Sequence, residues 1–250
     1  MKFVVDTHTH TVASGHAYST IIENAQVAKS VGLSHLCITD HASTMPGAPH
    51  YWHFVNQKVI PDTLCGVHIL RGVEANIMDV QGELDMPCYV YAKMEWVNAS
   101  LHEAVFRPEN KDIHTRAMIG AIASQLVDAI AHPGNPSYPI DAEAVVDAAV
   151  THGVAIELNN SSLNGSRQGS ESYCEKIAVL AKEKGAWITT GSDAHFCNDI
   201  GNFASVAELI QRVGLSQDQV ITSDSSLFDA FQKKRFGIRC KRVAEMMGDV

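Results

Sequence analysis

The stretch Phe3-Val4-Val5-Asp6-Thr7-His8-Thr9-His10 is a short apolar run that leads into two histidines. If this run is a β-strand, residues two apart point to the same face, so Asp6, His8 and His10 project together. Two imidazoles side by side at a strand end can bind one metal ion, and Asp6 is placed to support them from deeper in the strand. The first ten residues therefore predict a metal site at the end of a strand.

The same arrangement recurs along the chain, with polar ligand types at or just beyond the ends of apolar, β-rich segments. The further candidates are His16, His41, Glu74, His102, His132, Asp193 and His195. One histidine after a strand is weak evidence, because most single histidines are structural or exposed. Seven histidines and two carboxylates in a repeated position predict a metalloenzyme, whereas His35, His68, His114 and His152 stand at strand starts or in helices and are read as structural.

Apolar β-type segments alternate with helical patterns along the chain. We expect strands at 3–7, 35–40, 67–74, 96–101, 127–131, 154–159 and 186–190, and helices at 20–31, 112–125, 141–152, 170–184, 202–212 and 225–234. Segment 42–66 contains three prolines and is expected to be a long loop with at most one short helix. Repeated alternation of this kind predicts an α/β fold with a parallel, TIM-like barrel or nearly closed barrel, formed by a single domain over 1–250. The ligand candidates then lie at the carboxyl ends of the strands, where barrel enzymes build their active sites.

Composition narrows the classes of function. The formal net charge of -9, without a basic run, argues against binding a nucleic-acid polymer. No apolar stretch approaches the roughly 20 residues that span a bilayer, so no membrane partner is expected. The six cysteines show no paired spacing, which is typical of thiols in a reducing compartment, and the predicted location is cytoplasmic.

Nine ligands are too many for one zinc ion, which takes about four. Shared among about three ions they leave open positions for water and substrate, and an imidazole-rich, thiol-free set suits Zn²⁺, with Mn²⁺ or Fe²⁺ as alternatives. Three divalent ions and two carboxylates leave a positive balance that favours an anionic substrate. We therefore expect a small phosphate monoester to be hydrolysed by a metal-bound hydroxide, since bound metal lowers the pKa of water to about 7.

The motifs His8-x-His10, His16, Asp40-His41, Glu74, His102, His132-Pro133-Gly134 and Asp193-x-His195 together resemble the PHP (polymerase and histidinol phosphatase) family. The similarity covers about residues 3 to 235 and is greatest to a small stand-alone branch of probable phosphatases, known as YcdX-like. It implies a distorted (β/α)7 barrel with a trinuclear, usually zinc, site.

The resemblance also distributes the ligands among three ions. It implies that the first ion is held by His8, His10, Glu74 and Asp193, the second by Glu74 as a bridge with His102 and His132, and the third by His16, His41 and His195. Glu74, Asp193 and His195 would then act in catalysis by holding the ions that carry the hydroxide.

Outside this set the signals are weaker. The turn 159–162, with Ser166 and Arg167, is a candidate phosphate contact through Arg167. His50, Trp52 and His53 are candidates to line or cover the pocket, and ordinary loop packing explains them equally well.

Three other functions remain open at this stage. Barrel amidohydrolases also begin with His-x-His, but they commonly bridge two metals with a carboxylated lysine, and a two-metal scheme leaves His16 and His41 without a role. A phosphodiesterase or nuclease activity is known in other PHP relatives, but this chain shows no basic groove. A non-enzymatic metal-binding protein would not need a barrel mouth open to substrate.

Overall fold

A computed structural model describes residues 1–248 of the chain. Seven strands form one parallel sheet in the order β1-β2-β4-β5-β6-β7-β8. Their bounds are β1 Val5–Asp6, β2 His35–Ile38, β4 Val67–Asn76, β5 Trp96–Ser100, β6 Ala129–Ile130, β7 Ala155–Asn159 and β8 Ile188–Gly191. A short strand, β3 (Thr63–Leu64), adds to β4 as an antiparallel hairpin.

The first and last strands of the sheet approach each other and nearly close it into a barrel. Thr7 Oγ1 lies 2.8 Å from Thr189 Oγ1, and beyond the strand ends the Asp193 amide donates to the His8 carbonyl at 2.8 Å. The Asp6 carboxylate accepts hydrogen bonds from the Ser192 and Gly201 amides, so it joins β1 to the segment that follows β8. The distorted TIM-like barrel expected from the sequence is confirmed.

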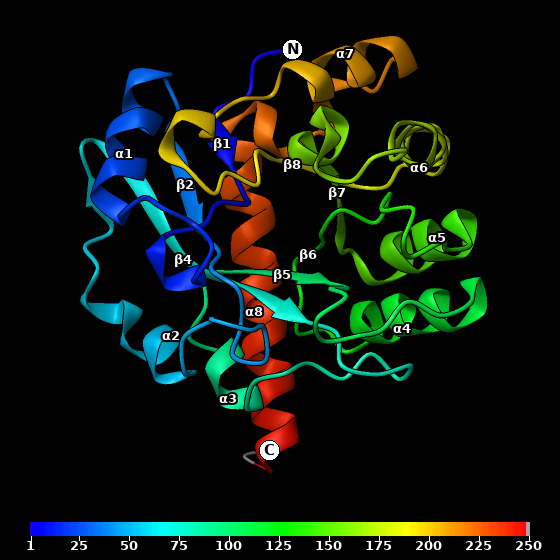
Figure 1. Cartoon of the computed structure of the whole chain (residues 1–250), viewed down its shortest axis with the longest axis horizontal. Coiled ribbons are helices and arrows are strands. Elements are labelled where there is room, and N and C mark those ends of the chain that lie inside the picture. The colour runs from blue at the N-terminus through cyan, green and yellow to red at the C-terminus, as the bar shows by residue number, and fades with distance from the viewer. Residues whose placement is uncertain (249–250) are drawn as a thin grey trace.

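Helices surround the sheet, as Figure 1 shows, with α1 on one side and α4, α5 and α6 on the other. The helices are α1 Ile21–Ser30, α2 Trp52–Asn56, α3 Cys88–Tyr91, α4 Lys111–Ala123, α5 Ala142–His152, α6 Glu171–Lys184, α7 Ala204–Val213 and α8 Ser225–Met247. Glycines in the left-handed conformation end α5 at Gly153 and α6 at Gly185, where the absence of a side chain makes this conformation accessible. Within residues 1–248, no helix has both the length and the apolar character that a membrane crossing requires.

The hydrophobic core has two parts. The larger part fills the space between the sheet and the outer helices. The smaller part lies where the strands begin, and there Phe228 and Phe231 of α8 pack against Val5, Trp96 and other first residues of the strands. The helix α8 therefore closes one end of the barrel and leaves the opposite, carboxyl end for the loops.

Three local elements differ from the sequence prediction. The helix α8 continues to Met247, well past the predicted end at residue 234. The prediction ends too early because the buried inner face of the helix carries Arg235 and Arg239 instead of apolar residues. The irregular segment 42–66 contains the strand β3 as well as the expected short helix, α2. The short helix α3 had no counterpart in the prediction.

Candidate metal centre

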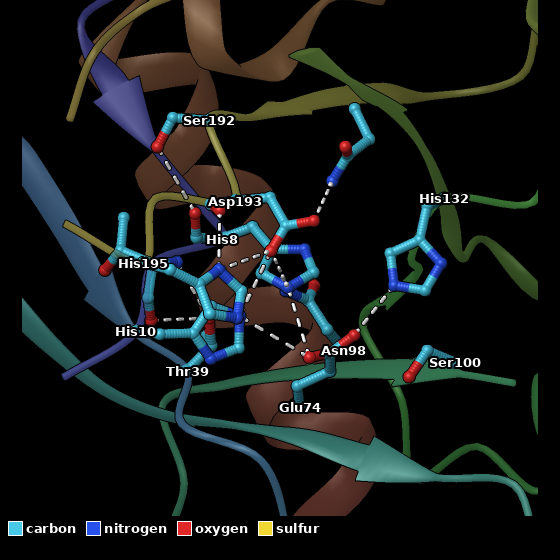
Figure 2. A network of polar contacts seen from close by, with 12 residues as sticks. His8, His10, Thr39, Glu74, Asn98, Ser100, His132, Ser192, Asp193 and His195 are labelled. Carbon is cyan, nitrogen blue, oxygen red and sulfur yellow. Dashed lines mark hydrogen bonds and ion pairs between the residues drawn. The ribbon is translucent and has the colours of Figure 1, made fainter. Parts of the chain in front are cut away.

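All nine predicted ligand residues meet at the carboxyl end of the barrel. His8 and His10 follow β1, His41 follows β2, and Glu74 lies near the end of β4. His102, His132, Asp193 and His195 follow β5, β6 and β8, and His16 comes from the loop that connects β1 to α1. Figure 2 shows several of these side chains pointing toward one another from different strand ends, and the ring centroids of His10 and His195 are 4.2 Å apart.

Four side chains form the most compact set. His8 Nε2 lies 3.3 Å from Glu74 Oε2 and 3.6 Å from Asp193 Oδ1. His10 Nε2 lies 3.6 Å and 3.2 Å from the same two oxygens. Ligands about 2.0 Å from a tetrahedral zinc ion are separated by roughly 3.3 Å, so these spacings fit one such ion.

The Glu74 carboxylate faces two groups of histidines with its two oxygens. Its Oε2 faces His8 and His10, whereas its Oε1 lies 2.9 Å from His132 Nε2 and 3.3 Å from His102 Nε2. A carboxylate with one oxygen toward each group is arranged to bridge two ions. Glu74 belongs to two of the clusters whose ligand atoms lie within 4.8 Å of one another, His8–Glu74–His132 and His41–Glu74–His102.

The remaining histidines lie at the outer side of the centre. His16 Nε2 and His195 Nε2 are 3.0 Å apart, and the His41 ring stacks on His16 with centroids 5.0 Å apart. His41 also places its Nδ1 2.8 Å from Glu74 Oε2, and it clusters with His10 and His195. His41 therefore stands between the first set and the pair His16–His195.

Buried polar atoms without a hydrogen-bond partner converge at the centre. They include Nε2 of His8 and His10, both ring nitrogens of His41, and Oε2 of Glu74. Although His41 Nδ1 and Glu74 Oε2 are 2.8 Å apart, the angle between the groups is not that of a hydrogen bond. Leaving such groups unpaired costs about 1–3 kcal/mol each, so a native fold normally satisfies them. Divalent cations would satisfy the whole group at once, because every one of these atoms can act as a metal ligand.

The outer ring nitrogens have hydrogen-bond partners that fix how the rings are turned. His8 Nδ1 bonds Glu157 Oε1 at 2.8 Å, and His102 Nδ1 bonds Asn76 Oδ1 at 2.8 Å. His10 Nδ1 bonds the Ser14 hydroxyl, which donates in turn to Asp40. Such partners hold the Nδ1–H tautomer, so that Nε2 would be free to bind a metal ion.

The electrostatic environment favours ionised carboxylates. Burial alone would raise the pKa of Glu74, but the surrounding imidazoles of His8, His102 and His41 hold it well below its usual value. Burial likewise opposes ionisation of Asp193, whereas His8 and Arg167 lower its pKa well below the usual range. The centre therefore provides two carboxylate anions at neutral pH.

The histidine rings of the centre differ in the direction in which their pKa values are shifted. Burial lowers the pKa of His132 to about 4, and burial also lowers the pKa of His10 well below its usual value, so both rings are neutral. Burial would lower the pKa of His8 as well, but the Glu157, Glu74 and Asp193 carboxylates outweigh it and raise the pKa. The carboxylates around His8 thus favour a positive charge at this position, which a bound cation would supply.

Two of the ligand residues have a backbone conformation that side chains rarely adopt. His132 has φ 34° and Asp193 has φ 57°, and neither is glycine. Positive φ at such residues costs about 1–3 kcal/mol and is often found at functional sites. The geometry of the centre is therefore held by the surrounding fold.

A small cavity of about 220 Å³ opens beside the ligands and forms the mouth of the centre. Arg167 lines it, and its Nη1 donates to Asp193 Oδ2 at 2.9 Å and to Ser162 Oγ at 3.1 Å. His53 is the nearest of the three loop candidates to the centre, with Nε2 4.0 Å from Asp40 Oδ2. His50 accepts a hydrogen bond from the Trp52 amide within its own turn, and Trp52 is largely exposed.

The four histidines that the sequence predicts to be structural contact residues near them in the fold. His114 lies between the Glu109 amide and the Pro139 carbonyl, and His152 bonds Gln125. His35 bonds Ser34 and lies against His68 near Asp229 of α8. These four residues belong to other parts of the molecule than the metal centre.

A sequence model of the PHP domain matches residues 6–238 of the chain. The chain belongs to the PHP domain family. It is 55% identical over 235 residues to a probable phosphatase from Photobacterium profundum, covering 94% of this chain and 96% of that protein. It is 53% identical over 236 residues to a probable phosphatase from Vibrio campbellii, covering 94% of each.

Solved structures with a similar fold are much more distant in sequence. A histidinol phosphate phosphatase from Lactococcus lactis, complexed with zinc, L-histidinol and phosphate, has a TM-score of 0.55 and 14% identity, with 86% of this chain and 95% of that chain covered. A histidinol phosphatase from Listeria monocytogenes, described as putative, has a TM-score of 0.56 and 16% identity, with 81% and 99% covered. At these identities the likeness concerns the PHP fold alone.

In this PHP domain, sequence reasoning found the ligand candidates but missed the residues that support them. The sequence prediction gives no role to Glu157, although its carboxylate bonds both the His8 ring and the His132 amide. Gly191 of β8 passes so close to Glu157 and His8 that a Cβ there would collide with both. Asp6, expected to support the histidines, accepts a hydrogen bond from the His8 amide at 3.4 Å and binds backbone amides of the loop after β8. The one available signal for Glu157 was its charge inside an apolar strand.

Proposed function

We propose that this chain is a metal-dependent phosphomonoesterase that acts on a small phosphorylated compound and holds about three divalent ions, with zinc the leading candidate. The observation that carries the proposal is the Glu74 carboxylate, whose two oxygens face separate pairs of imidazoles at 2.9–3.6 Å. A single-metal protein has no need of such a bridge.

The ligands divide among three ions as the PHP resemblance implies. His8, His10, Glu74 and Asp193 would hold the first ion, and Glu74 with His102 and His132 the second. His16, His41 and His195 would hold the third, with His41 placed close to the first set as well. Imidazole and carboxylate donors without thiolate suit zinc, manganese or iron better than calcium or magnesium. When bound, these ions would polarise the ester and make hydroxide available from water near neutral pH.

The chain itself contributes charge at the mouth. The Glu74 and Asp193 carboxylates would neutralise only part of the positive charge of three divalent ions. Arg167 adds one positive charge and Glu157 adds one negative charge, so the net positive charge of the site stays the same. We propose that Arg167 contacts the phosphate through the guanidinium nitrogens that do not bind Asp193. A guanidinium fixed by a carboxylate is preorganised to bind phosphate.

Attack by water, and not by a side chain, is part of the proposal. Burial raises the pKa of the Cys174 thiol to about 12 and that of Cys37 well above its usual value, so neither is a ready nucleophile. No strand-to-helix serine elbow competes with the histidines in the sequence. Chelation should therefore abolish hydrolysis, whereas thiol and serine reagents should leave it nearly intact. Isolation of a phosphorylated enzyme intermediate would contradict this.

The names of the relatives agree with the proposal, since close PHP relatives are called probable phosphatases and one protein of similar fold is complexed with zinc and phosphate. The test combines elemental analysis of protein never exposed to chelator with assays on phosphomonoesters, phosphodiesters and amides. We expect about three metals per chain and turnover of monoesters. Preference for diesters or amides would favour the nuclease or amidohydrolase alternative, and a fully metallated protein without hydrolysis would favour a metal-binding role.

A further inference from the structure

A second, smaller cavity of about 140 Å³ lies next to the mouth of the metal centre. Ser161, Ser166 and Asp193 line both cavities, so the two are neighbours with a shared wall. The walls of this side pocket come from the loop after β7 and the loop after β8. The remaining lining residues are Asn160, Asn164, Ser192, Asp199 and Asn202.

The side pocket is lined only by amide, hydroxyl and carboxylate side chains. Asn160 is buried, and its Oδ1 accepts a hydrogen bond from the Val206 amide, which leaves its NH₂ group as a donor. Asn164 Oδ1 is bonded to Ser205 in the same way. Asp199 and Asn202 stand at the exposed rim. The pocket therefore offers several donors together with the acceptor oxygens of Asp199.

The polar lining of the side pocket excludes several kinds of organic group that could be joined to the phosphate of an ester substrate. A nucleobase would need an aromatic or aliphatic wall to stack on, and no such residue lines the pocket. A second phosphate or a carboxylate would face Asp193 and Asp199 with no lysine or arginine among the lining residues. The volume is also below the roughly 300–1,000 Å³ of pockets that hold drug-sized ligands. Hydroxyl groups fit, because each can both donate to a carboxylate and accept from an amide.

We propose that this side pocket binds the hydroxyl groups of the substrate's alcohol portion, so that the preferred substrate is a small sugar or polyol phosphate. Asp199 and Asn202 would be specificity-determining residues, with Asn160 fixing the inner wall. The inference rests on the proposed phosphatase function, because the phosphate group must lie at the metal centre for the alcohol to reach this pocket.

The test uses esters that differ only in their hydroxyl groups. For the metal-loaded full chain, kcat/KM is measured for glycerol 3-phosphate against propyl phosphate, with ethanolamine phosphate as a third ester. We expect at least a tenfold preference for the glycerol ester, the effect of roughly one good hydrogen bond. In Asp199→Asn and Asn202→Ala this ratio should fall toward one. Asn198→Ala, in the same loop but outside the pocket lining, is the matched control and should keep the ratio.

A binding measurement gives a readout that does not depend on turnover. Calorimetric Kd values for 3,4-dihydroxybutyl phosphonate and butyl phosphonate, which cannot be hydrolysed, should show the same tenfold difference and the same loss in the two variants. Equal kcat/KM and Kd values for the glycerol and propyl compounds would overturn the inference. A preference for ethanolamine phosphate would also overturn it. Either result would leave the proposed phosphatase function intact. Failure to hydrolyse any ester would instead refute the proposed function, and the phosphonates would still decide whether the pocket recognises hydroxyl groups.

Discussion

Where the strands begin, the buried Asp128 carboxylate accepts hydrogen bonds from Arg239 of α8 and from the Val97 amide. Arg239 also donates to the carbonyls of Tyr91 and Met94. Where the strands end, the Glu74 carboxylate is equally buried, but its neighbours include His8, His10 and His41, whose inner ring nitrogens have no hydrogen-bond partner. Both ends of the barrel thus bury charge. At the carboxyl end, a whole group of potential metal ligands is left free to bind something that the chain does not supply.

The comparison predicts that changes at the two ends affect different properties of the protein. Removing a partner at the end closed by α8 should lower stability and leave metal binding intact. Removing a ligand at the open end should lower metal content and activity.

The largest expected effect is at the bridge. Glu74→Ala should remove more than one ion per chain and lower kcat/KM by on the order of 10³-fold or more, because several functional groups depend on this one carboxylate. Elemental analysis and steady-state kinetics of the purified variant measure both. Glu83→Ala, an exposed carboxylate in a neighbouring loop, is the control. Loss of only one ion from Glu74→Ala would show that Glu74 does not bridge.

At the closed end, Arg239→Met should lower the free energy of unfolding by about 3–5 kcal/mol, since it leaves the buried Asp128 without its charged partner. Urea denaturation measures the change, and the folded variant should keep its metal content. Arg242→Met, an exposed position on the same helix, should change stability by at most about 1 kcal/mol. Unchanged stability in Arg239→Met, or loss of metal from the folded protein, would remove the distinction between the two ends.

The variant Glu157→Gln tests whether a residue that orients a proposed metal ligand affects metal binding as the ligand itself does. The change weakens the hydrogen bond that orients His8, so metal affinity or activity should fall by about 10–100-fold. Competition with a chromophoric chelator gives the affinity, and the exposed Glu183→Gln is the control. If Glu157→Gln binds metal as tightly as the parent, the supporting role assigned to Glu157 is wrong.

The smallest effect is expected at the outer histidines. The proposed third set contains no carboxylate, so its ion would keep its full charge for the phosphate. His16→Ala should weaken binding of inorganic phosphate by about tenfold and lower turnover, while the other two ions stay bound. Phosphate titration with metal counted in each sample measures this, and His152→Ala, at the end of α5 and away from the centre, serves as the control. Unchanged phosphate affinity, or loss of all metal together, would contradict the assignment.

The candidate ligands could be predicted from the sequence because their positions follow a rule of the fold. Polar residues that follow parallel strands are brought to one edge, so His41, Glu74 and His102 could be placed together without coordinates. No such rule reveals Glu157, because a carboxylate inside an apolar strand can face either a helix or the barrel interior. The same limit explains α8, since Arg235 and Arg239 look like exposed residues until Asp128 and the carbonyls they bind are known.

The left-handed backbone at His132 and Asp193 has a consequence for how this protein can change. Each of these conformations lowers the stability of the fold by about 1–3 kcal/mol relative to glycine, although histidine and aspartate adopt it more readily than most other residues. Activity and thermal stability are therefore in conflict at these two positions, so substitution by glycine would relieve strain as it removes a metal ligand. Mutations that preserve activity must leave this strain in place. They can add stability only elsewhere, as in the outer helices or the contacts of α8.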